Sequence, residues 1–449
     1  MTTAQTASTP TSTHRRALVA YEKRTPESRR LFRQAGEVIA GSVSRSTLAF
    51  EPYPFYGAVA AGARVTDVDG NPYLDLVNNY TSLAHGHGHG PTASAAAREL
   101  TRSTGSGTAN PREALYAEQL RDRLPSMQRL RFTTSGSEAT GFAVRAARAH
   151  TGRTRVLKFE GGFHGSHNEL HRDVASREPL PTGTAIPSRP AAGGMEPSET
   201  VTAVYNDPTS VRTAFERWGT QIAAVIVEPF LGNASLVTAD RPFLDQIFAS
   251  ASEAGALVVF DEVQSLRAGY RGAQGMWGYA PDLTAIGKIM GGGFALAAYG
   301  GRADIFDVFS PGPQQLVQTG TFTATPLALA AGQAAMAALD ETAYDDLAAR
   351  TDRLRDGLRR AARDAGIPVH VNGLGSMFDI AFSTRPVDSY RAHYTADADL
   401  LAEVRLHMVN AGVLIMPRGT GCLSTAVTDE DVDEAIAAFT AALNLSTGG

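Results

Sequence analysis

The sequence of 449 residues contains a single cysteine, Cys422, and no long apolar run. Without a second cysteine no intrachain disulfide can form, and a zinc cluster built from several cysteines is excluded as well. We expect Cys422 to be a buried, inert thiol. No stretch approaches the roughly 20 apolar residues that cross a bilayer, and the first residues lack a hydrophobic signal core. These absences predict a cytoplasmic protein with no membrane partner.

Charged residues are also few, at 19%, and the net charge is −5. A nucleic-acid partner is not expected, because such binding depends on a concentration of Lys and Arg. Hydrophobic residues make up 43% of the chain, which is typical of a globular enzyme and not of a disordered or fibrous protein. At this length we expect two or three lobes with well-buried cores.

The chain divides into four parts by pattern. Residues 1–14 are rich in Ser, Thr and Ala without apolar periodicity, which indicates a flexible tail. Residues 15–90 contribute to a small lobe, and the alternation around Asp69-Gly70 predicts an antiparallel hairpin there. Residues 91–330 form a large domain, and residues 331–449 form a small α+β domain that begins with a long amphipathic helix.

Short apolar runs alternate with helical patterns through the large domain. This alternation predicts an α/β fold with a mainly parallel sheet flanked by helices. Polar or acidic residues follow several of the runs, and ligands of such sheets collect at the carboxyl ends of the strands. The sequence therefore predicts one crevice at that edge. The runs are 130–133, 155–159, 202–205, 222–227 and 256–260.

Lys288 is the strongest candidate for a catalytic residue. It lies between an apolar stretch and the triple glycine Gly291-Gly292-Gly293. Burial of a lysine lowers the pKa of its amine and frees the neutral, nucleophilic form, which can make a Schiff base with an aldehyde cofactor. A phosphate-binding or surface lysine is the alternative. The pattern of a phosphate-binding ATPase loop does not fit, because Ile289 stands where Ser or Thr would follow the lysine.

Two further segments have the chemistry to hold such a cofactor. Ser135-Gly136-Ser137 opens a predicted helix that runs to about residue 150, so its N–H groups would face an anion such as phosphate. An ordinary helix cap is the alternative. Asp261 ends an apolar strand, and a protonated pyridine nitrogen would give its buried carboxylate a cationic partner. A structural carboxylate that caps a turn is the alternative there.

Aromatic and amide side chains accompany these segments. Phe163 could stack on a planar ring, and Val263 could pack on the opposite face of that ring. Gln264 could donate a hydrogen bond to a phenolic oxygen of the cofactor. Simple core packing and a plain loop amide are the alternatives for these residues.

Together these segments resemble the fold-type I, class III aminotransferases, which depend on pyridoxal 5'-phosphate (PLP). Within that family they resemble the branch of the glutamate-1-semialdehyde aminomutases and the β-amino-acid (β-phenylalanine) aminotransferases. The resemblance covers roughly residues 30 to 445. The motifs that carry it are Ser135–Ala139, Phe163-His164-Gly165, Val227-Glu228-Pro229, Phe260–Gln264, Gly287-Lys288 and Gly320-Thr321.

The resemblance implies a role for each of these residues and a seven-stranded type of sheet in the large domain. Lys288 would hold PLP as a Schiff base, Asp261 would pair with the pyridine nitrogen, and Gly136 and Ser137 would bind the phosphate. Thr321 resembles a threonine that reaches the phosphate of the neighbouring subunit, which implies a homodimer with shared active sites. The implied cofactor-binding set is Ser135, Gly136, Ser137, Phe163, His164, Glu228, Asp261, Val263, Gln264, Lys288 and Thr321.

Arg45 and Arg418 resemble the carboxylate-binding arginines of the β-amino-acid aminotransferases, and Tyr80 resembles a residue that lines the substrate pocket of that branch. A guanidinium matches a carboxylate through two parallel hydrogen bonds. We therefore predict an aminotransferase that moves an amino group from a carboxylate-bearing amine, with a β-amino acid favoured, to a keto acid such as 2-oxoglutarate or pyruvate. Surface ion pairs are the alternative for the arginines.

Other outcomes on the same fold stay open. An aminomutase or an amino-acid racemase would use the same residues, although Gln264 stands where the aminomutase branch commonly has methionine, which favours an aminotransferase. A catalytically silent relative is the alternative from another class, and the presence of both Lys288 and Asp261 argues against it. No metal is expected: His85, His87 and His89 alternate with glycine, but no acidic or cysteine residues accompany them.

Overall fold

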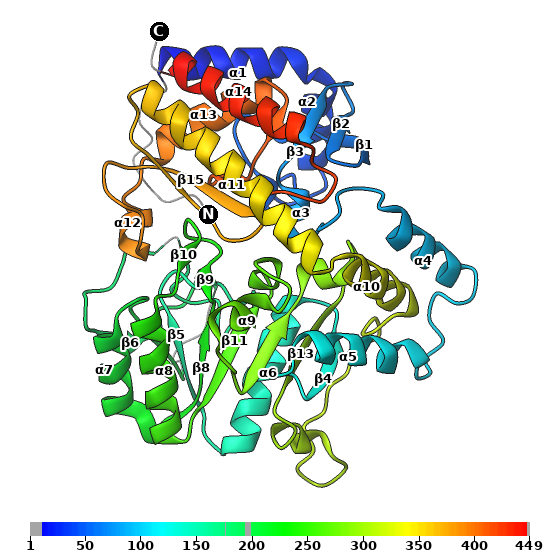
Figure 1. Ribbon diagram of the computed structural model, residues 1–449, viewed down its shortest axis with the longest axis vertical. Coiled ribbons are helices and arrows are strands. Elements are labelled where there is room, and N and C mark those ends of the chain that lie inside the picture. The colour runs from blue at the N-terminus through cyan, green and yellow to red at the C-terminus, as the bar shows by residue number, and fades with distance from the viewer. Residues whose placement is uncertain (1–10, 176, 194–198, 447–449) are drawn as a thin grey trace. The chain divides into compact units, whose positions relative to one another are not determined.

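The computed structural model describes residues 11–175, 177–193 and 199–446, and it divides into two compact units. The central unit comprises Gly90–Tyr344 and Asp388–Tyr394. The terminal unit comprises the chain up to His89, Asp345–Val387 and the chain from Thr395 onward. Figure 1 shows the elements of each unit in chain order by colour.

An eight-stranded sheet forms the middle of the central unit, in the order β4-β13-β12-β11-β8-β5-β7-β6. Strands β12, β11, β8, β5 and β7 run parallel to their neighbours, whereas β13 and the edge strand β6 are antiparallel to theirs. The predicted α/β fold with a mainly parallel sheet is confirmed, although the sheet has eight strands and not the seven that the resemblance implied, because β6 pairs with β7 at its edge. The strands are β4 (Arg129–Thr133), β5 (Arg155–Phe159), β6 (Ala185–Pro187), β7 (Thr200–Ala203), β8 (Ile222–Val227), β11 (Leu257–Glu262), β12 (Leu283–Ile286) and β13 (Ala297–Gly301).

Helices pack on both faces of this sheet. Successive strand residues point to opposite faces, and in β11 Val259 packs into the cluster formed by α6 (Gly136–Thr151), whereas Phe260 contacts Phe248 of α8 (Arg241–Ala254). Small residues of α6, among them Ala143, let the helix approach the strands closely. Burial on both faces explains why β8 is apolar throughout and why β11 is apolar from Leu257 to Phe260.

The terminal unit contains two smaller sheets. The first has the order β1-β2-β3-β16, and its β2 and β3 form the predicted antiparallel hairpin. Since β16 pairs with β3 in parallel, the two ends of the chain share one sheet. The strands of the two sheets are β1 (Gly57–Ala61), β2 (Arg64–Asp67), β3 (Pro72–Asp75) and β16 (Val413–Leu414), and then β14 (Val369–Asn372), β15 (Met377–Phe382) and β17 (Thr420–Cys422).

Long helices cover these sheets, and α1 lies beside α13 and α14 in Figure 1. The amphipathic segment predicted near residues 341–365 is the helix α11. The helices are α1 (Ser12–Arg24), α2 (Pro26–Gly36), α11 (Glu341–Asp364), α13 (Ala398–Asn410) and α14 (Asp429–Ser446).

The expectation of a flexible tail up to residue 14 is wrong for its last residues, because α1 begins at Ser12. Thr11 caps this helix, since its Oγ1 accepts a hydrogen bond from the His14 N–H at 2.9 Å. The Thr11 hydroxyl also donates to the Glu403 carboxylate of α13 at 2.7 Å. This contact is polar and its partner is distant in sequence, so the segment shows no apolar periodicity from which the helix could be predicted. Residues 1–10 lie outside the described part of the chain.

Helix α10 (Pro326–Ala338) belongs to the central unit, where it packs against α4 (Gly90–Leu100). The boundary expected at residue 330 therefore falls inside a helix.

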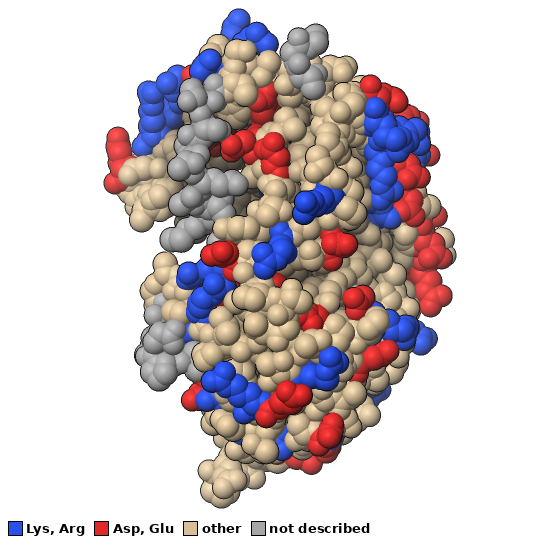
Figure 2. Space-filling model, turned by 90° about the vertical axis from the view of Figure 1, so that its left-hand side faces the viewer, with Lys and Arg blue, Asp and Glu red and all other residues tan. Residues whose placement is uncertain are grey.

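Basic and acidic side chains are interspersed on the face shown in Figure 2. Ion pairs of this kind join α11 to α14, where Arg353 contacts Asp433 at 2.7 Å. In the described part of the chain, no helix is both long enough and apolar enough to traverse a lipid bilayer.

Candidate active site

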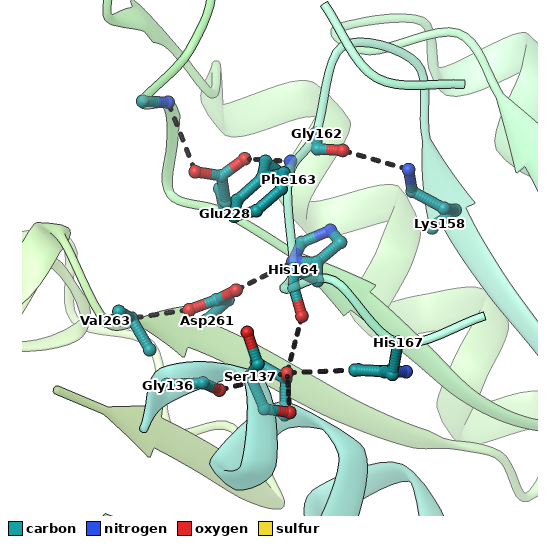
Figure 3. A network of polar contacts seen from close by, with 12 residues as sticks. Gly136, Ser137, Lys158, Gly162, Phe163, His164, His167, Glu228, Asp261 and Val263 are labelled. Carbon is teal, nitrogen blue, oxygen red and sulfur yellow. Dashed lines mark hydrogen bonds and ion pairs between the residues drawn. The ribbon is translucent and has the colours of Figure 1, made fainter. Parts of the chain in front are cut away.

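The predicted crevice residues of the central unit meet at the carboxyl edge of its sheet (Figure 3). Phe163 and His164 follow β5, and Glu228 follows β8. Asp261 lies near the end of β11, and Lys288 follows β12. Because these four strands point the same way, their ends bring the side chains to one place.

A buried contact between Asp261 and His164 occupies the middle of this edge. His164 Nδ1 lies 2.8 Å from Asp261 Oδ2, and the two side chains are 1% and 5% exposed. The Val263 N–H donates to the other carboxylate oxygen at 3.1 Å. Burial lowers the pKa of His164, although the neighbouring Asp261 raises it. With Asp261 ionised, Nδ1 must carry the proton that joins the pair. His164 thus acts on the site through Asp261.

Glu228 fixes the backbone of the loop that carries Phe163. Its carboxylate accepts the Phe163 N–H at 2.8 Å and the Gly232 N–H at 3.2 Å. Burial raises the pKa of Glu228 to about 8 and the charge of Asp261 adds to the rise, whereas the two N–H groups and Lys288 lower it. The Gln264 amide packs against Gly232, where an added Cβ would lie 2.2 Å from Gln264 Oε1.

Lys158 supports the same loop, although no role was predicted for it from the sequence. It lies within β5, fully buried, and its Nζ donates to the Gly162 carbonyl at 2.9 Å and to the Arg172 carbonyl. Burial lowers the pKa of Lys158 to about 8. The sequence does contain a signal for this role. Lys158 stands inside the apolar run Val156–Phe159, and a charged side chain buried there requires a partner.

The start of α6 is both a capped helix end and a place of close backbone approach. Ser135 is the cap, because its Oγ accepts the Glu138 N–H at 3.3 Å. A Cβ on Gly136 would lie 2.8 Å from Val263 Cγ1, and one on Gly165 would lie 2.7 Å from Ser137 Cα. Two neighbouring loops therefore pack closely on the first turn of the helix, where backbone N–H groups favour an anion. This cradle fits a phosphate group.

Lys288 has a backbone conformation that is uncommon for a residue with a side chain. Its φ is +51°, and it begins a short 3-10 helix, Lys288–Gly291. Such conformations cost about 1–3 kcal/mol and cluster at functional sites. The preceding Gly287 packs on Val263, where an added Cβ would lie 3.2 Å from Cγ1. Val263 thus lies between the start of α6 and the lysine loop.

The predicted substrate residues belong to the terminal unit, and two of them touch each other. The Arg45 guanidinium lies 4.7 Å from the centre of the Tyr80 ring and donates to Asn79 Oδ1 at 2.8 Å. The Tyr80 hydroxyl donates to the Thr47 carbonyl. Arg418 is partly buried in a turn between β16 and β17, which the Met416 N–H closes by donating to the Thr420 carbonyl at 2.9 Å.

Tyr80 lies in a left-handed turn. The four residues Asn78–Thr81 all have positive φ values, of 48°, 48°, 56° and 68°. Asn78 anchors the turn by donating to the Cys422 carbonyl at 2.9 Å, and its N–H donates to Asp75 Oδ1 at 3.0 Å. Left-handed geometry costs roughly 1–2 kcal/mol per residue with a side chain, so the turn depends on these anchors.

The histidines of the Gly-His segment have structural partners. His87 Nε2 contacts Asp75 Oδ2 at 2.7 Å, and so holds the carboxylate that anchors the left-handed turn. The rings of His85 and His89 stack with their centres 4.2 Å apart. Over the residues that the structure describes, no group of three His, Cys, Asp or Glu side chains is arranged to hold a metal ion. Cys422 is buried, as expected.

Known proteins are similar to this chain over nearly its whole length. The family model described as "Aminotransferase class-III" matches residues 51–443. A glutamate-1-semialdehyde 2,1-aminomutase 2 of Geobacillus kaustophilus is 37% identical over 421 residues, which cover 92% of this chain and 96% of that protein.

Solved structures give the same result. An omega-transaminase from Sphaerobacter thermophilus superposes with a TM-score of 0.88 at 36% identity, covering 94% of this chain and 98% of that one. A β-phenylalanine aminotransferase from Variovorax paradoxus has the same TM-score at 32% identity, covering 96% of each chain. A transaminase with PLP bound also superposes with a TM-score of 0.88, at 32% identity, covering 94% of this chain and 98% of that one.

The cradle at α6 leads to a first prediction. Gly136→Ala should weaken PLP binding by about tenfold or more, because the added methyl meets Val263 and overpacking costs about 1–3 kcal/mol. Titration of the apoprotein with PLP, followed by absorbance, measures this. Gly90→Ala is the matched control, since an added Cβ at the start of α4 meets nothing within 4 Å. Equal PLP affinity in both variants would contradict the cradle.

Burial of Glu228 leads to a second prediction, on pH. Because the pKa of Glu228 is raised to about 8, the folded protein keeps a proton that the unfolded chain releases near its ordinary pKa of 4.5. The stability that this proton gives is complete below pH 4.5 and is lost as the pH rises through 8. Relative to Glu228→Gln, the wild type should lose up to about 1.4 kcal/mol per pH unit in this window.

Urea unfolding of the two apoproteins at pH values from about 5 to about 8 tests this. The free energy of unfolding of the glutamine variant will differ from that of the wild type by a constant offset, since its amide N–H₂ must face a backbone N–H. Only the slope with pH decides, and parallel curves would contradict the prediction.

Proposed function

Because the chain belongs to the class III aminotransferases, a family of PLP-dependent enzymes, we propose that it transfers an amino group from a carboxylate-bearing amine to a keto acid. A β-amino acid is the favoured donor, and 2-oxoglutarate or pyruvate is the acceptor. The observation that carries the proposal is Arg45, which is exposed and makes no ion pair with a carboxylate among the described residues of its unit. Its guanidinium can therefore bind a substrate carboxylate with two parallel hydrogen bonds.

The residues of the central unit fit PLP. The start of α6, with Gly136 and Ser137, would bind the phosphate, and Asp261 would face the ring nitrogen. When bound, PLP supplies an electron sink that stabilises negative charge on the amine-bearing carbon of the substrate. Asp261 would keep a proton on that nitrogen, because a buried carboxylate favours a cationic partner. His164 and the Val263 N–H fix the orientation of Asp261.

Lys288 supplies the base. The amine of Lys288 would take the proton from the amine-bearing carbon at Nζ and return it elsewhere on the same face, as one general acid and base. Phe163, whose N–H is fixed by Glu228, would stack on the ring and hold it in place. In this mechanism Lys288 and Phe163 have the roles that were predicted for them from the sequence.

An aminomutase is the second possibility, since relatives with 37% identity carry that name. Gln264 is evidence against an aminomutase, because that branch commonly has methionine at this position. The Gln264 side chain packs on Gly232 beside Glu228. The similarity to the β-phenylalanine aminotransferase, at 32% identity over 96% of the chain, supports transfer to a separate acceptor.

A donor panel tests the proposed reaction. The purified holoenzyme is given β-phenylalanine, an α-amino acid or 1-phenylethylamine, each with 2-oxoglutarate or pyruvate, and formation of glutamate or alanine is measured. We expect transfer from the β-amino acid, and a kcat/KM about tenfold or more lower for 1-phenylethylamine, because the charge-assisted hydrogen bonds to its missing carboxylate are lost. Isomerisation or racemisation of an amino substrate without consumption of keto acid would refute the proposal.

We further propose a homodimer in which Thr321 completes the neighbouring site. Thr321 is exposed and is flanked by Val317 and Phe322, which are 60% and 70% exposed. Large apolar side chains at such exposure favour a protein partner. Gln318 anchors this segment to the sheet, because it accepts hydrogen bonds from Arg131 and Tyr299 and donates to the Phe132 carbonyl.

Mixing two inactive variants tests the shared site. Lys288→Ala lacks the base, which should cost at least about a hundredfold in activity, and Thr321→Ala should bind PLP weakly. In a mixed dimer, one site combines Lys288 of one subunit with Thr321 of the other. Co-refolding at equal amounts should therefore restore about one quarter of wild-type activity at limiting PLP. Failure to restore activity, with mixed dimers shown by mass spectrometry, would argue against the shared site.

A further inference from the structure

Arg405 is a buried cation in the terminal unit, and it has no direct role in the proposed reaction. It lies on α13 and is 5% exposed, and it makes no ion pair with a carboxylate among the described residues. Burial lowers the pKa of Arg405 to about 10, and the nearby phenols of Tyr80 and Tyr21 raise it. A buried guanidinium costs free energy unless its contacts compensate, so its contacts indicate what it holds in place.

The first contact leads to the segment that carries Arg418. Arg405 Nε donates to the Ile415 carbonyl at 3.1 Å. Ile415 is buried and comes directly after β16, at the start of the turn in which Arg418 lies. The Gly419 N–H donates to the Met416 carbonyl at 3.0 Å, which closes that turn over a few residues. A displacement of Ile415 would therefore be passed directly to Arg418.

The second contact leads to the segment that carries Arg45. The Arg405 guanidinium lies 4.2 Å from the centre of the Phe50 ring. Phe50 packs into the core of the terminal unit, whereas the preceding residues 44–49 are exposed. Besides this contact, the segment is held by the Tyr80 hydroxyl, which donates to the Thr47 carbonyl. Phe50 is therefore the apolar anchor of an otherwise exposed segment.

We propose that Arg405 is a positioning residue that joins the segments of Arg45 and Arg418, and so sets the enzyme's preference for donors with a carboxylate. The inference rests on the proposed function. The planar guanidinium suits this task, since its face stacks on Phe50 while Nε, in its plane, reaches the Ile415 carbonyl. Neither an apolar residue nor a lysine offers both contacts with the same geometry.

The test compares two donors in the holoenzyme: β-phenylalanine, and 1-phenylethylamine as the analogue without a carboxylate. Arg405→Met keeps an apolar side chain of similar length but loses the stacking charge and the Nε donor. We expect the ratio of kcat/KM for the two donors to fall about tenfold. The change should lie in KM for the β-amino acid, while kcat and the absorption spectrum of the bound cofactor stay near wild type. Arg405→Lys, which keeps the charge, should recover part of the ratio.

Arg355→Met is the matched control. Arg355 is a partly buried arginine of the same unit that also donates to a backbone carbonyl, that of Met377, at 3.1 Å. Its loss should lower stability without changing the ratio between donors. A merely structural role for Arg405 would lower kcat/KM for both donors alike, as a general loss of folded enzyme does, and that result would overturn the proposal.

Phe50→Leu approaches the same contact from the other side and decides the matter if Arg405→Met does not fold. It should lower the donor ratio as well, and the double variant should add little to either single change, because both remove one interaction. An unchanged ratio in Phe50→Leu, or full additivity, would overturn the proposal. Failure of the proposed function has a different signature: the wild type itself would show no transamination or no preference for the carboxylated donor, and the role of Arg405 would fall with it.

Discussion

The central unit is organised around one constraint, a carboxylate buried at the end of a strand. Asp261 cannot stay charged in the interior without donors, and it has them in His164 and the Val263 N–H. Those donors in turn must be held. His164 follows the loop that Lys158 supports through the Gly162 carbonyl, and the N–H of Phe163 in this loop is held by Glu228. Each buried polar group near the site thus needs the next one, which explains why so many of them lie in one place.

A second constraint is space. Val263 follows Asp261 by two residues and contacts both Gly136 and Gly287, at positions where a methyl group on either glycine would press against it. The side chain of Val263 therefore lies between the start of α6, the candidate anion site, and the loop of Lys288, and it sets their separation. The strained backbone of Lys288 is tolerated because the loop is packed on both sides. If a cofactor binds with its phosphate at α6 and its aldehyde at Lys288, packing and not hydrogen bonding would set the spacing of these two ends of the site.

Much of the sheet and of its polar edge could be predicted, because the signals are local. An apolar run such as Ile222–Val227, buried on both faces, is legible in the sequence, and so is the acid that follows it. The edge strand β6 was not predicted, since three residues ending on Pro187 give neither alternation nor an apolar run. The helix from Ser12, the buried pair of Lys158 and Gly162, and the contact of Arg405 with Ile415 depend on partners that only the folded chain brings near. The left-handed turn at Asn78–Thr81 is a further case, because its anchors at Asp75 and Cys422 come from two ends of the sequence.

The two units also differ in how firmly they hold their functional side chains. In the central unit, Asp261, His164 and Glu228 are almost completely buried, and each carboxylate is held on both oxygens. In the terminal unit, Arg45 is exposed and its segment has few anchors. Rigid, desolvated groups suit the common chemistry of the family, since its charges must be stabilised without reorganisation. Mobile or lightly anchored arginines suit the binding of two substrates of different shape. Relatives that carry the names of an aminomutase and of transaminases have similar identity to this chain, 37% and 36%. Overall similarity therefore does not separate the two reactions, and the difference between them has to be sought in a few lightly held side chains and in Gln264.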